Sequence, residues 1–438
     1  MEWWLIVSLF IGGLLFLMGI GVPVAFCFLL VNLIGIYIFW GPAGLEQLVI
    51  GMSGSVATSS YLPLVTFVLM GAIMSHTGMV TQIVDALDKW LGRIPGRLTL
   101  LTVLSGTILS TVSGSSMASA STLTKALIPE MHSRGYHKFM FLGSVLGSGG
   151  LAVMIPPSTL GVILASLAGI SIGKFLIAII IPGFLMAFFY LTYILTICKI
   201  KPSLAPPYDV PNIPLREKIT ALVVHILPLG GIVFLVVGVI FLGLATPTEA
   251  ASLGALGTIV LAFLYRKLSW ELLKKSLMDT VEIAGMSLII ITGAFSFSQL
   301  LAYSGATAIL IESLASLNAP PVFVLILMLF SVLILGMFVS AVPNMMIVIP
   351  IFMPVIHAVG LDPLWVGVLV LIVIEMSQTT PPVGILMYVV KSALPKDYDV
   401  TSGDIMKATL PYLLCDLAAL IVIIIFPAFA LWLPNLMR

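Results

Sequence analysis

The sequence predicts an all-α protein that crosses a membrane many times and contains an internal duplication. The first reason is composition: 60% of the 438 residues are hydrophobic and 8% are charged, whereas soluble proteins carry about 25% charged residues. The second is that apolar runs of about 18 residues or more recur along the chain, as membrane-spanning helices require. The third is a set of paired Gly- and Pro-rich interruptions within these runs. Such breaks free backbone groups, which must face protein, water or a bound solute rather than lipid.

The same composition disfavours several other classes of protein. The alternating strands of a membrane β-barrel, about ten residues each, are absent from the sequence. The net charge of +1, without a basic patch interleaved with aromatic residues, gives no sign of a nucleic-acid partner. Cys27, Cys198 and Cys415 lie in apolar runs without metal-ligand spacing, so we expect buried thiols. Phosphate-binding, nucleophile-elbow and metalloprotease motifs are missing, so we expect neither an enzyme nor an organic cofactor.

The internal duplication is indicated by identities that recur at one offset. The first copies are Pro129, His132, Gly135 and Pro156, and the second copies are Pro354, His357, Gly360 and Pro381, each 225 residues later. The Pro-Pro pairs at 156–157 and 381–382 share this offset. A duplication explains the common spacing. The alternative is that Pro-Pro simply ends two unrelated helices.

The N-terminal segments read as membrane spans. Residues 3–40 are long enough for two tightly turned spans or one long tilted span, with the break at Gly19–Pro23. Because Gly and Ser are frequent at 41–58, we expect a loop there. A further span is expected at about 59–78.

The first half of the chain then contains both kinds of interruption. The basic segment that ends at Arg97 is predicted to be cytoplasmic by the positive-inside bias. Residues 98–131 are too long for a simple span and are interrupted at Ser113–Ser116. They predict a re-entrant hairpin, or two half-helices that meet at a polar tip. Residues 139–198 predict a segment broken at Pro156-Pro157 and then a long apolar run.

A proline-rich stretch at 199–218 is the clearest soluble linker, and its excess of basic residues favours the cytoplasm. A span follows at about 220–243. Thr246, Pro247 and Glu249 have the spacing of a helix N-cap, with Pro at the first helical position and a capping box.

The second copy repeats the pattern of the first. Residues 266–280 are amphipathic and predict a helix that lies in the membrane interface. Breaks follow at 336–344 and 378–384, and the last span is expected at 410–433.

The polar residues at the four breaks are the candidate site. Their hydroxyls and freed carbonyls suit a weakly held sodium ion, and half-helix N-termini suit an anion. The candidate ion ligands are Ser113, Gly114, Ser115, Ser116, Gly336, Val339, Ser340, Thr379, Thr380 and Pro381. The candidate substrate contacts are Ser116, Gly150, Pro156, Pro157, Ser158, Asn344, Pro382 and Gly384. The alternative is that these small residues only let helices pack closely.

Few ionisable residues lie within the spans. Glu375 is an intramembrane carboxylate and therefore a functional candidate: it relays a proton, binds a cation, or hydrogen-bonds the opposing break to hold its shape. Lys125 either counters a substrate carboxylate or extends to the surface. His76, His137 and His225 have no partner at metal-ligand spacing, so no metal besides sodium is expected.

With these residues in view, the chain resembles the large membrane subunit of the TRAP (tripartite ATP-independent periplasmic) transporters over essentially its whole length. The resemblance rests on these motifs: Gly21-Val22-Pro23, Gly71 through Gly78, Ser113–Ser116, Ile128–Met131 with Gly135-Tyr136, Ile155–Ser158, Ala245–Ala251, and Glu375 with Thr380–Gly384. It implies a sodium-driven importer of organic acids such as carboxylates in the bacterial inner membrane. It also implies inverted repeats and an elevator-like motion of a transport domain against a scaffold.

The resemblance further implies two partners, a small four-helix membrane subunit and a soluble periplasmic substrate-binding protein. No small-subunit sequence is fused to this chain, so that partner is expected to be a separate polypeptide. Two positions that are often acidic in the family are Ser119 and Ser340 here, which leaves the pocket less negative and puts sodium stoichiometry and substrate class in question.

On this basis the chain divides into six stretches. They are N-terminal scaffold spans (1–58), repeat 1 with a hairpin and a broken helix (59–198), a cytoplasmic linker (199–219), scaffold spans with an interfacial helix (220–280), repeat 2 with a hairpin and a broken helix (281–409), and a C-terminal span (410–438).

Two other functions stay open at this point. A one-component sodium/carboxylate symporter of similar architecture would need no periplasmic binding protein. An intramembrane enzyme would need a catalytic dyad, and Glu375 has no partner that the sequence reveals. A channel gives no reason for duplicated breaks.

Overall fold

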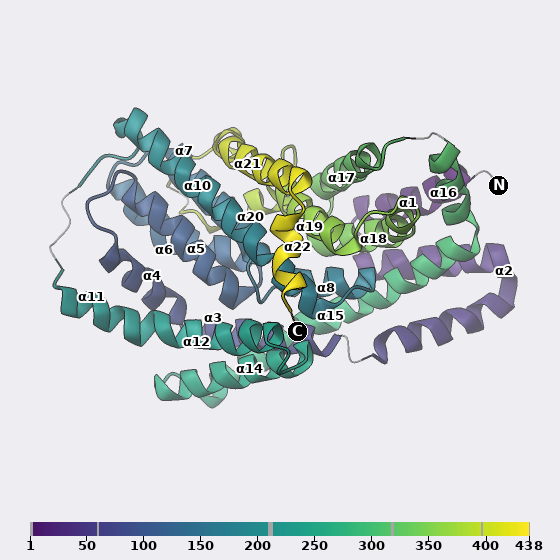
Figure 1. Ribbon diagram of the computed structural model, residues 1–438, viewed down its shortest axis with the longest axis horizontal. Coiled ribbons are helices and arrows are strands. Elements are labelled where there is room, and N and C mark those ends of the chain that lie inside the picture. The colour runs from purple at the N-terminus through teal and green to yellow at the C-terminus, as the bar shows by residue number, and fades with distance from the viewer. Residues whose placement is uncertain (1–2, 59–60, 209–212, 317–318, 396, 438) are drawn as a thin grey trace.

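The computed structural model describes residues 3–58, 61–208, 213–316, 319–395 and 397–437. The described part is helical and contains no strand, and it is shown in Figure 1. The predicted all-α membrane class is confirmed: among the described residues, eight helices are long and apolar enough to cross a membrane, or up to ten if each bent pair counts as one span.

The helices of the first half are α1 (Trp3–Gly19), α2 (Val24–Val56), α3 (Leu62–His76), α4 (Met79–Trp90), α5 (Arg97–Ser113), α6 (Ser116–Ser133), α7 (Lys138–Met154), α8 (Thr159–Ala168), α9 (Ile172–Ala178) and α10 (Ile180–Ile200). Those of the second half are α11 (Leu215–Ala221), α12 (Leu227–Val233), α13 (Val239–Phe241), α14 (Pro247–Leu264), α15 (Trp270–Tyr303), α16 (Ala306–Ser316), α17 (Pro321–Phe338), α18 (Ala341–Ala358), α19 (Pro363–Thr379), α20 (Ile385–Ala393), α21 (Ser402–Ile425) and α22 (Ala428–Asn435). Two π-helical stretches, Leu222–Ile226 and Phe234–Gly238, join α11, α12 and α13 into one rod.

The duplication is visible in the helix boundaries. Helix α18 begins and ends 225 residues after α6, and α19 begins and ends 225 residues after α7. Helices α5 and α17 also end at the same offset. The Pro156-Pro157 and Pro381-Pro382 peptide bonds are both cis. Each half therefore carries a helical hairpin, α5–α6 or α17–α18, followed by a helix that ends at a Pro-Pro pair.

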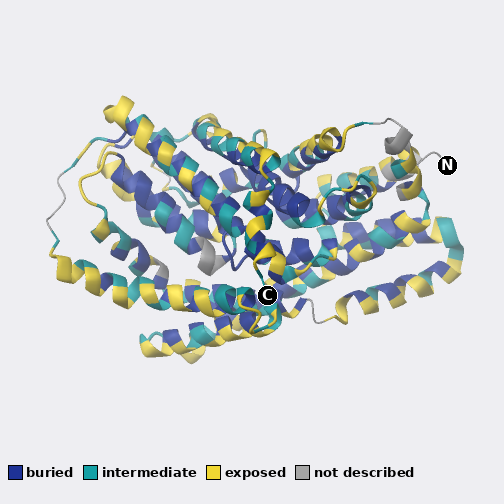
Figure 2. Ribbon diagram, viewed as in Figure 1, coloured by how far each residue is buried: buried dark blue, intermediate teal, exposed yellow. Residues whose placement is uncertain are grey.

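The two helices that end at the Pro-Pro pairs form the centre of the molecule. Every residue from Met140 to Met154 of α7 is buried, and so is every residue from Trp365 to Thr379 of α19. Figure 2 shows buried residues at the centre and exposed residues on the outer helices, and many of the exposed residues are large and apolar. Gly143 and Gly147 of α7 permit close approach of the Tyr412 ring, because a Cβ at either glycine would lie within 2.6 Å of a ring atom.

The predicted interruptions are confirmed at the level of helix ends. Helix α5 ends at Ser113 and α6 begins at Ser116, while α17 ends at Phe338 and α18 begins at Ala341. Helices α7 and α8 form a span that is bent by 47° at 155–158. Gly19–Pro23 separates α1 from α2, as expected.

The loop expected at 41–58 is wrong, because α2 continues through this stretch to Val56. Only Gly41 has non-helical backbone angles, with φ of 63°. Pro42 then starts the next helical turn, a position at which its missing N–H costs no helical hydrogen bond. Gly51 serves packing, because a Cβ there would lie 2.5 Å from the Gln299 side chain of α15.

The separate interfacial helix expected at 266–280 is also wrong. These residues form the start of α15, which runs without a break from Trp270 to Tyr303 after the Ser269 cap. Nothing between 270 and 303 interrupts the helical backbone, so the amphipathic residues belong to the first part of one long helix. The N-cap expected at Thr246 is confirmed, including its capping box with Glu249.

Two further boundaries differ from the sequence prediction. The last long span begins at Ser402 rather than at about 410, because Thr401 and Asp404 form a capping box there. The linker is shorter than 199–219, since α10 reaches Ile200 and α11 begins at Leu215. The linker is fixed to the base of α5, where Arg97 Nη1 donates a hydrogen bond of 2.7 Å to the Tyr208 hydroxyl. Burial raises the pKa of Tyr208.

Candidate functional site

The first polar tip joins α5 to α6 at Gly114 and Ser115. Gly114 has φ of +56°, and a Cβ there would lie 2.7 Å from Thr159 Oγ1 at the start of α8. Only glycine therefore fits both the left-handed backbone and the close approach of the broken helix. The Ser115 hydroxyl accepts a hydrogen bond of 3.4 Å from the Ala118 N–H and caps α6. Ser113 ends α5, and its side chain lies outside the described part of the structure.

The second polar tip joins α17 to α18 at Val339 and Ser340. Gly336 packs directly against α19, since a Cβ there would lie 2.0 Å from Ser377 Oγ and 2.6 Å from Asn344 Nδ2. Ser340 occupies the N-cap position of α18 but makes no side-chain cap hydrogen bond. The tip is thus held by close packing of Gly336 against neighbouring side chains and by the Gln378 amide, rather than by a serine cap.

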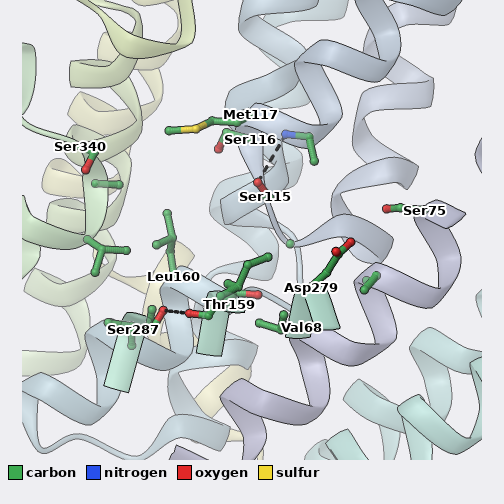
Figure 3. A pocket seen from close by; sticks show the side chains of 18 of the residues that line it. Val68, Ser75, Ser115, Ser116, Met117, Thr159, Leu160, Asp279, Ser287 and Ser340 are labelled. Atoms are coloured by element: carbon green, nitrogen blue, oxygen red, sulfur yellow. Dashed lines mark hydrogen bonds between the residues drawn. The ribbon is translucent and has the colours of Figure 1, made fainter. Parts of the chain in front are cut away.

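A cavity of about 400 Å³ lies between the two tips. Figure 3 shows Ser115 and Ser116 of the first tip and Ser340 of the second tip around the same space as Asp279 of α15. Helix α3 contributes Val68, Gly71, Ala72, Ser75 and His76, and α15 contributes Asp279, Ile283 and Ser287. The cavity therefore lies between the two hairpins on one side and α3 and α15 on the other.

The structure brings only part of the sequence-predicted set to this cavity. Its lining includes Gly114, Ser115, Ser116, Ser340 and Glu375. The described lining does not include Gly336, Val339, Thr379, Thr380, Pro381, Gly150, Pro156, Pro157, Ser158, Asn344, Pro382 or Gly384. Several of these have other contacts: Ser158 caps α8 through the Gly161 N–H at 3.0 Å, and the Thr379 and Thr380 hydroxyls both donate to the Met376 carbonyl.

A hydrogen bond links the first tip to the second repeat. Ser116 Oγ donates to Glu375 Oε1 at 2.6 Å, across 259 residues of sequence. Glu375 is 2% exposed, and its other oxygen, Oε2, has no hydrogen-bond partner among the described residues. Of the three roles considered for Glu375, this contact supports holding the opposing break in shape.

Ser116→Ala tests this contact. The substitution would leave both oxygens of buried Glu375 without a partner, which costs about 1–3 kcal/mol for an unsatisfied group. We expect a lower melting temperature of the detergent-purified protein. Glu375→Gln should change it less and keep much of the transport activity, because a glutamine oxygen still accepts from Ser116.

Ser148→Ala is the matched control. Ser148 is also buried, but its hydroxyl donates within its own helix, to the Val145 carbonyl at 3.2 Å. Equal melting temperatures for Ser116→Ala and Ser148→Ala would contradict a stabilising role for the bond to Glu375.

Two buried amide side chains surround the second tip. Asn344 Nδ2 donates to the Val332 carbonyl at 3.1 Å, and Gln378 Nε2 lies 3.4 Å from the carbonyls of both Gly336 and Val339. Their oxygens, Asn344 Oδ1 and Gln378 Oε1, are buried and have no hydrogen-bond partner among the described residues. Buried acceptors without a donor are rare and call for an explanation such as a bound ion or water.

Sequence reasoning missed a hydrogen-bonded pair of ionisable side chains in the cavity wall. His76 Nε2 lies 2.6 Å from Asp279 Oδ2, although 203 residues separate them in sequence. The spacing search found no partner for His76 because the partner is on α15, in the other half of the chain. Asp279 gave little signal of its own, because it lies in the charged first part of α15, between Lys275 and Glu282.

The described residues contain no group of three His, Cys, Asp or Glu side chains arranged to hold a metal ion. Lys125, considered as a counter-charge for the substrate, is exposed and does not line the cavity. Cys27 and Cys198 are buried free thiols, as expected, and Cys415 is half-buried.

Solved structures share this architecture. The YdaH transporter of Alcanivorax borkumensis superposes with a TM-score of 0.65 at 15% identity, covering 91% of each chain. Neisseria gonorrhoeae MtrF, described as one of a class of antimetabolite efflux pumps, superposes with a TM-score of 0.63 at 16% identity, covering 97% of this chain and 94% of its own. The likeness shows the fold: a multi-span helical membrane protein whose two hairpins surround a cavity.

The sequence comparisons identify the family. The model of the tripartite ATP-independent periplasmic transporter DctM component matches residues 11–429, and the chain belongs to this family of large permease subunits. The recognition made from the sequence motifs is therefore confirmed. The chain is accordingly a multi-pass protein of the bacterial inner membrane.

Characterised relatives differ in what their names say they transport. The chain is 30% identical to the C4-dicarboxylate TRAP large permease DctM of Pseudomonas aeruginosa, over 91% of each protein. It is 27% identical to the ectoine permease TeaC of Halomonas elongata, over 98% of this chain and 99% of the relative. It is 28% identical to the sialic acid permease SiaM of Vibrio cholerae, over 97% of each.

Proposed function

We propose that this chain is the sodium-coupled permease of a tripartite importer that moves a small organic acid into the cell. A periplasmic binding protein would deliver the acid, and a separate small four-helix membrane subunit would complete the membrane complex. The observation that carries the proposal is the cavity between the two hairpin tips, where two helices begin and where the buried oxygens Glu375 Oε2 and Gln378 Oε1 have no donor in the described part of the chain.

Sodium coupling is supported by the oxygen chemistry of the second tip. Asn344 Oδ1 and Gln378 Oε1 have no partner within the described residues, and the Gly336 and Val339 carbonyls lie beside the Gln378 amide. Neutral oxygen atoms are the ligands that a hard cation accepts, and a site without a carboxylate cage binds it weakly enough for release. The Thr379 and Thr380 hydroxyls, at the end of α19, keep lone pairs free after donating to Met376. At the first tip, the proposed ion contacts are Gly114, Ser115 and Ser116.

Binding of an anion is supported by the helix starts at the cavity. Helices α6 and α18 begin at Ser116 and Ala341, and both residues line the cavity. The first N–H groups of a helix have no partner within the helix, and the helix dipole favours negative charge there. The two tips therefore suit a carboxylate and its coupling cation together.

The position of the cavity also supports an elevator-like cycle. The hairpins would move with the broken helices as the transport domain, while α3 and α15 would belong to the scaffold. A solute in the cavity touches both groups of helices, so sliding one past the other would change its access. The Pro156-Pro157 and Pro381-Pro382 breaks would travel with the hairpins.

The decisive test is uptake into proteoliposomes that contain this chain and its small partner, with and without a sodium gradient and the binding protein. Labelled organic acids would be supplied as a pool. Uptake that needs both sodium and the binding protein is expected. Uptake by this chain alone would instead favour a one-component sodium/carboxylate symporter, and uptake without sodium would overturn the coupling.

A further inference from the structure

The charges of the cavity wall point to more than an anionic solute. Among the described residues that line the cavity there is no Lys and no Arg. Its ionisable side chains are Asp279, Glu375 and His76. A solute with two carboxylates would therefore meet acidic side chains and no fixed cation other than a protonated His76. This is the opposite of the arginine-rich wall that recognition of several carboxylates normally uses.

The hydrogen-bond acceptors left free in the cavity also favour a positively charged group on the solute. Glu375 Oε2 and Gln378 Oε1 are both buried, neither has a hydrogen-bond partner among the described residues, and both residues line the cavity. The Gln378 amide nitrogen already lies beside carbonyl oxygens, so the oxygen is the free end of this side chain. These two acceptors await a donor, and a protonated nitrogen supplies one.

Asp279 is the acidic group most open to the cavity. Its side chain is 41% exposed, and its Oδ2 lies 2.6 Å from His76 Nε2. Figure 3 shows its carboxylate facing the same space as the hydroxyls of Ser115 and Ser75. The helix starts of α6 and α18 lie on the hairpin side of this space, and Asp279 lies on the α15 side.

We propose that the transported acid is a zwitterion: its carboxylate lies at the starts of α6 and α18, and its protonated ammonium or amidinium group faces Asp279. This rests on the proposed function and narrows the substrate class within it. His76 positions the Asp279 carboxylate, and Glu375 and Gln378 present acceptors beneath the solute. A solute with a second carboxylate in place of the nitrogen is disfavoured by repulsion from Asp279.

The test compares chain-matched probes that differ in one terminal group. 4-Aminobutyrate, 4-hydroxybutyrate and succinate form one such set, and 3-aminopropionate, 3-hydroxypropionate and malonate form a shorter one. Their affinities for the purified permease in sodium chloride would be measured by ligand-dependent thermal stabilisation. We expect at least a tenfold preference for the amine in at least one set. Tighter binding of the diacids, or no stabilisation by either amine, would overturn the proposal.

Variants assign the preference to a residue. Asp279→Asn should weaken amine binding at least tenfold and reduce the discrimination against the diacid. Glu271→Gln, in the exposed first turn of the same helix, should leave both unchanged. His76→Gln should keep the preference, because glutamine still donates to Asp279 but carries no positive charge. Loss of the preference in Glu271→Gln as well would show that overall charge, not Asp279, sets it.

The outcome separates this proposal from the function on which it rests. Sodium-dependent uptake of a diacid delivered by the binding protein would support the tripartite importer and contradict the proposal that the substrate is a zwitterion. If the amines bind normally but sodium drives the uptake of no probe, the zwitterion specificity stands and the sodium-coupled importer is contradicted.

Discussion

Gly336→Ala is expected to abolish sodium-driven uptake. The new methyl group would lie 2.0 Å from Ser377 Oγ and 2.5 Å from Ser377 Cβ, far inside van der Waals contact. Ser377 is fully buried in α19, so neither side chain has room to move aside. Helix α17 would have to shift from α19, which costs about 1–3 kcal/mol as overpacking and displaces the second tip. Uptake in proteoliposomes and melting temperature would be measured together.

Gly285→Ala is the control for this substitution. Gly285 lies within α15, and a Cβ there meets no atom within 4 Å. Alanine should be neutral or slightly stabilising at this position, because it favours a helix interior over glycine by about 1 kcal/mol. Near-normal uptake by Gly336→Ala would mean that α17 tolerates the displacement and that the tight contact does not matter for the tip.

Asn344→Leu is expected to raise the sodium concentration needed for half-maximal uptake at least tenfold. The leucine keeps the approximate volume but removes the unpartnered Oδ1 that faces no donor among the described residues. Loss of one interaction with a charged partner costs about 1.5–3 kcal/mol, and about 1.4 kcal/mol corresponds to tenfold in affinity. Sodium activation curves in proteoliposomes provide the measurement.

Asn32→Leu offers a matched comparison. Asn32 is also buried, donates to a main-chain carbonyl (Gly293, 2.7 Å) and has an unpartnered Oδ1, but it lies in α2 rather than at a tip. It should destabilise the protein without changing its sodium dependence. If both substitutions shift the activation curve equally, sodium coupling at Asn344 is contradicted and a general loss of stability explains the result.

The positions of the four breaks were predictable because they depend on local chemistry. Proline lacks an N–H and glycine reaches left-handed backbone angles, so both mark helix ends within apolar sequence. The loop expected at 41–58 from its many Gly and Ser residues did not form, since the chain only kinks at Gly41 and Pro42 and α2 continues. A Gly-Pro pair by itself does not distinguish a kink from a loop, because the packing of the following turns against α15 decides the outcome.

The chemistry within the cavity was less predictable. The contact of Ser116 with Glu375 spans 259 residues, and that of His76 with Asp279 spans 203. No local pattern encodes such pairs, since they arise only when the two halves pack together. For the same reason, the sequence placed Thr380 and Pro156 in one site with Ser115, whereas the cavity lining includes only Ser115 among these three.

The matching helix boundaries have a consequence for the history of the chain. Helices α6 and α7 and the turn between them have the same lengths as α18 and α19 and their turn. Each residue added within a helix rotates everything beyond it by about 100° and moves it by about 1.5 Å. A single insertion would therefore turn a tip away from its Pro-Pro break. The two copies have diverged in side chains while neither has gained or lost a residue relative to the other here, so selection has acted on length itself.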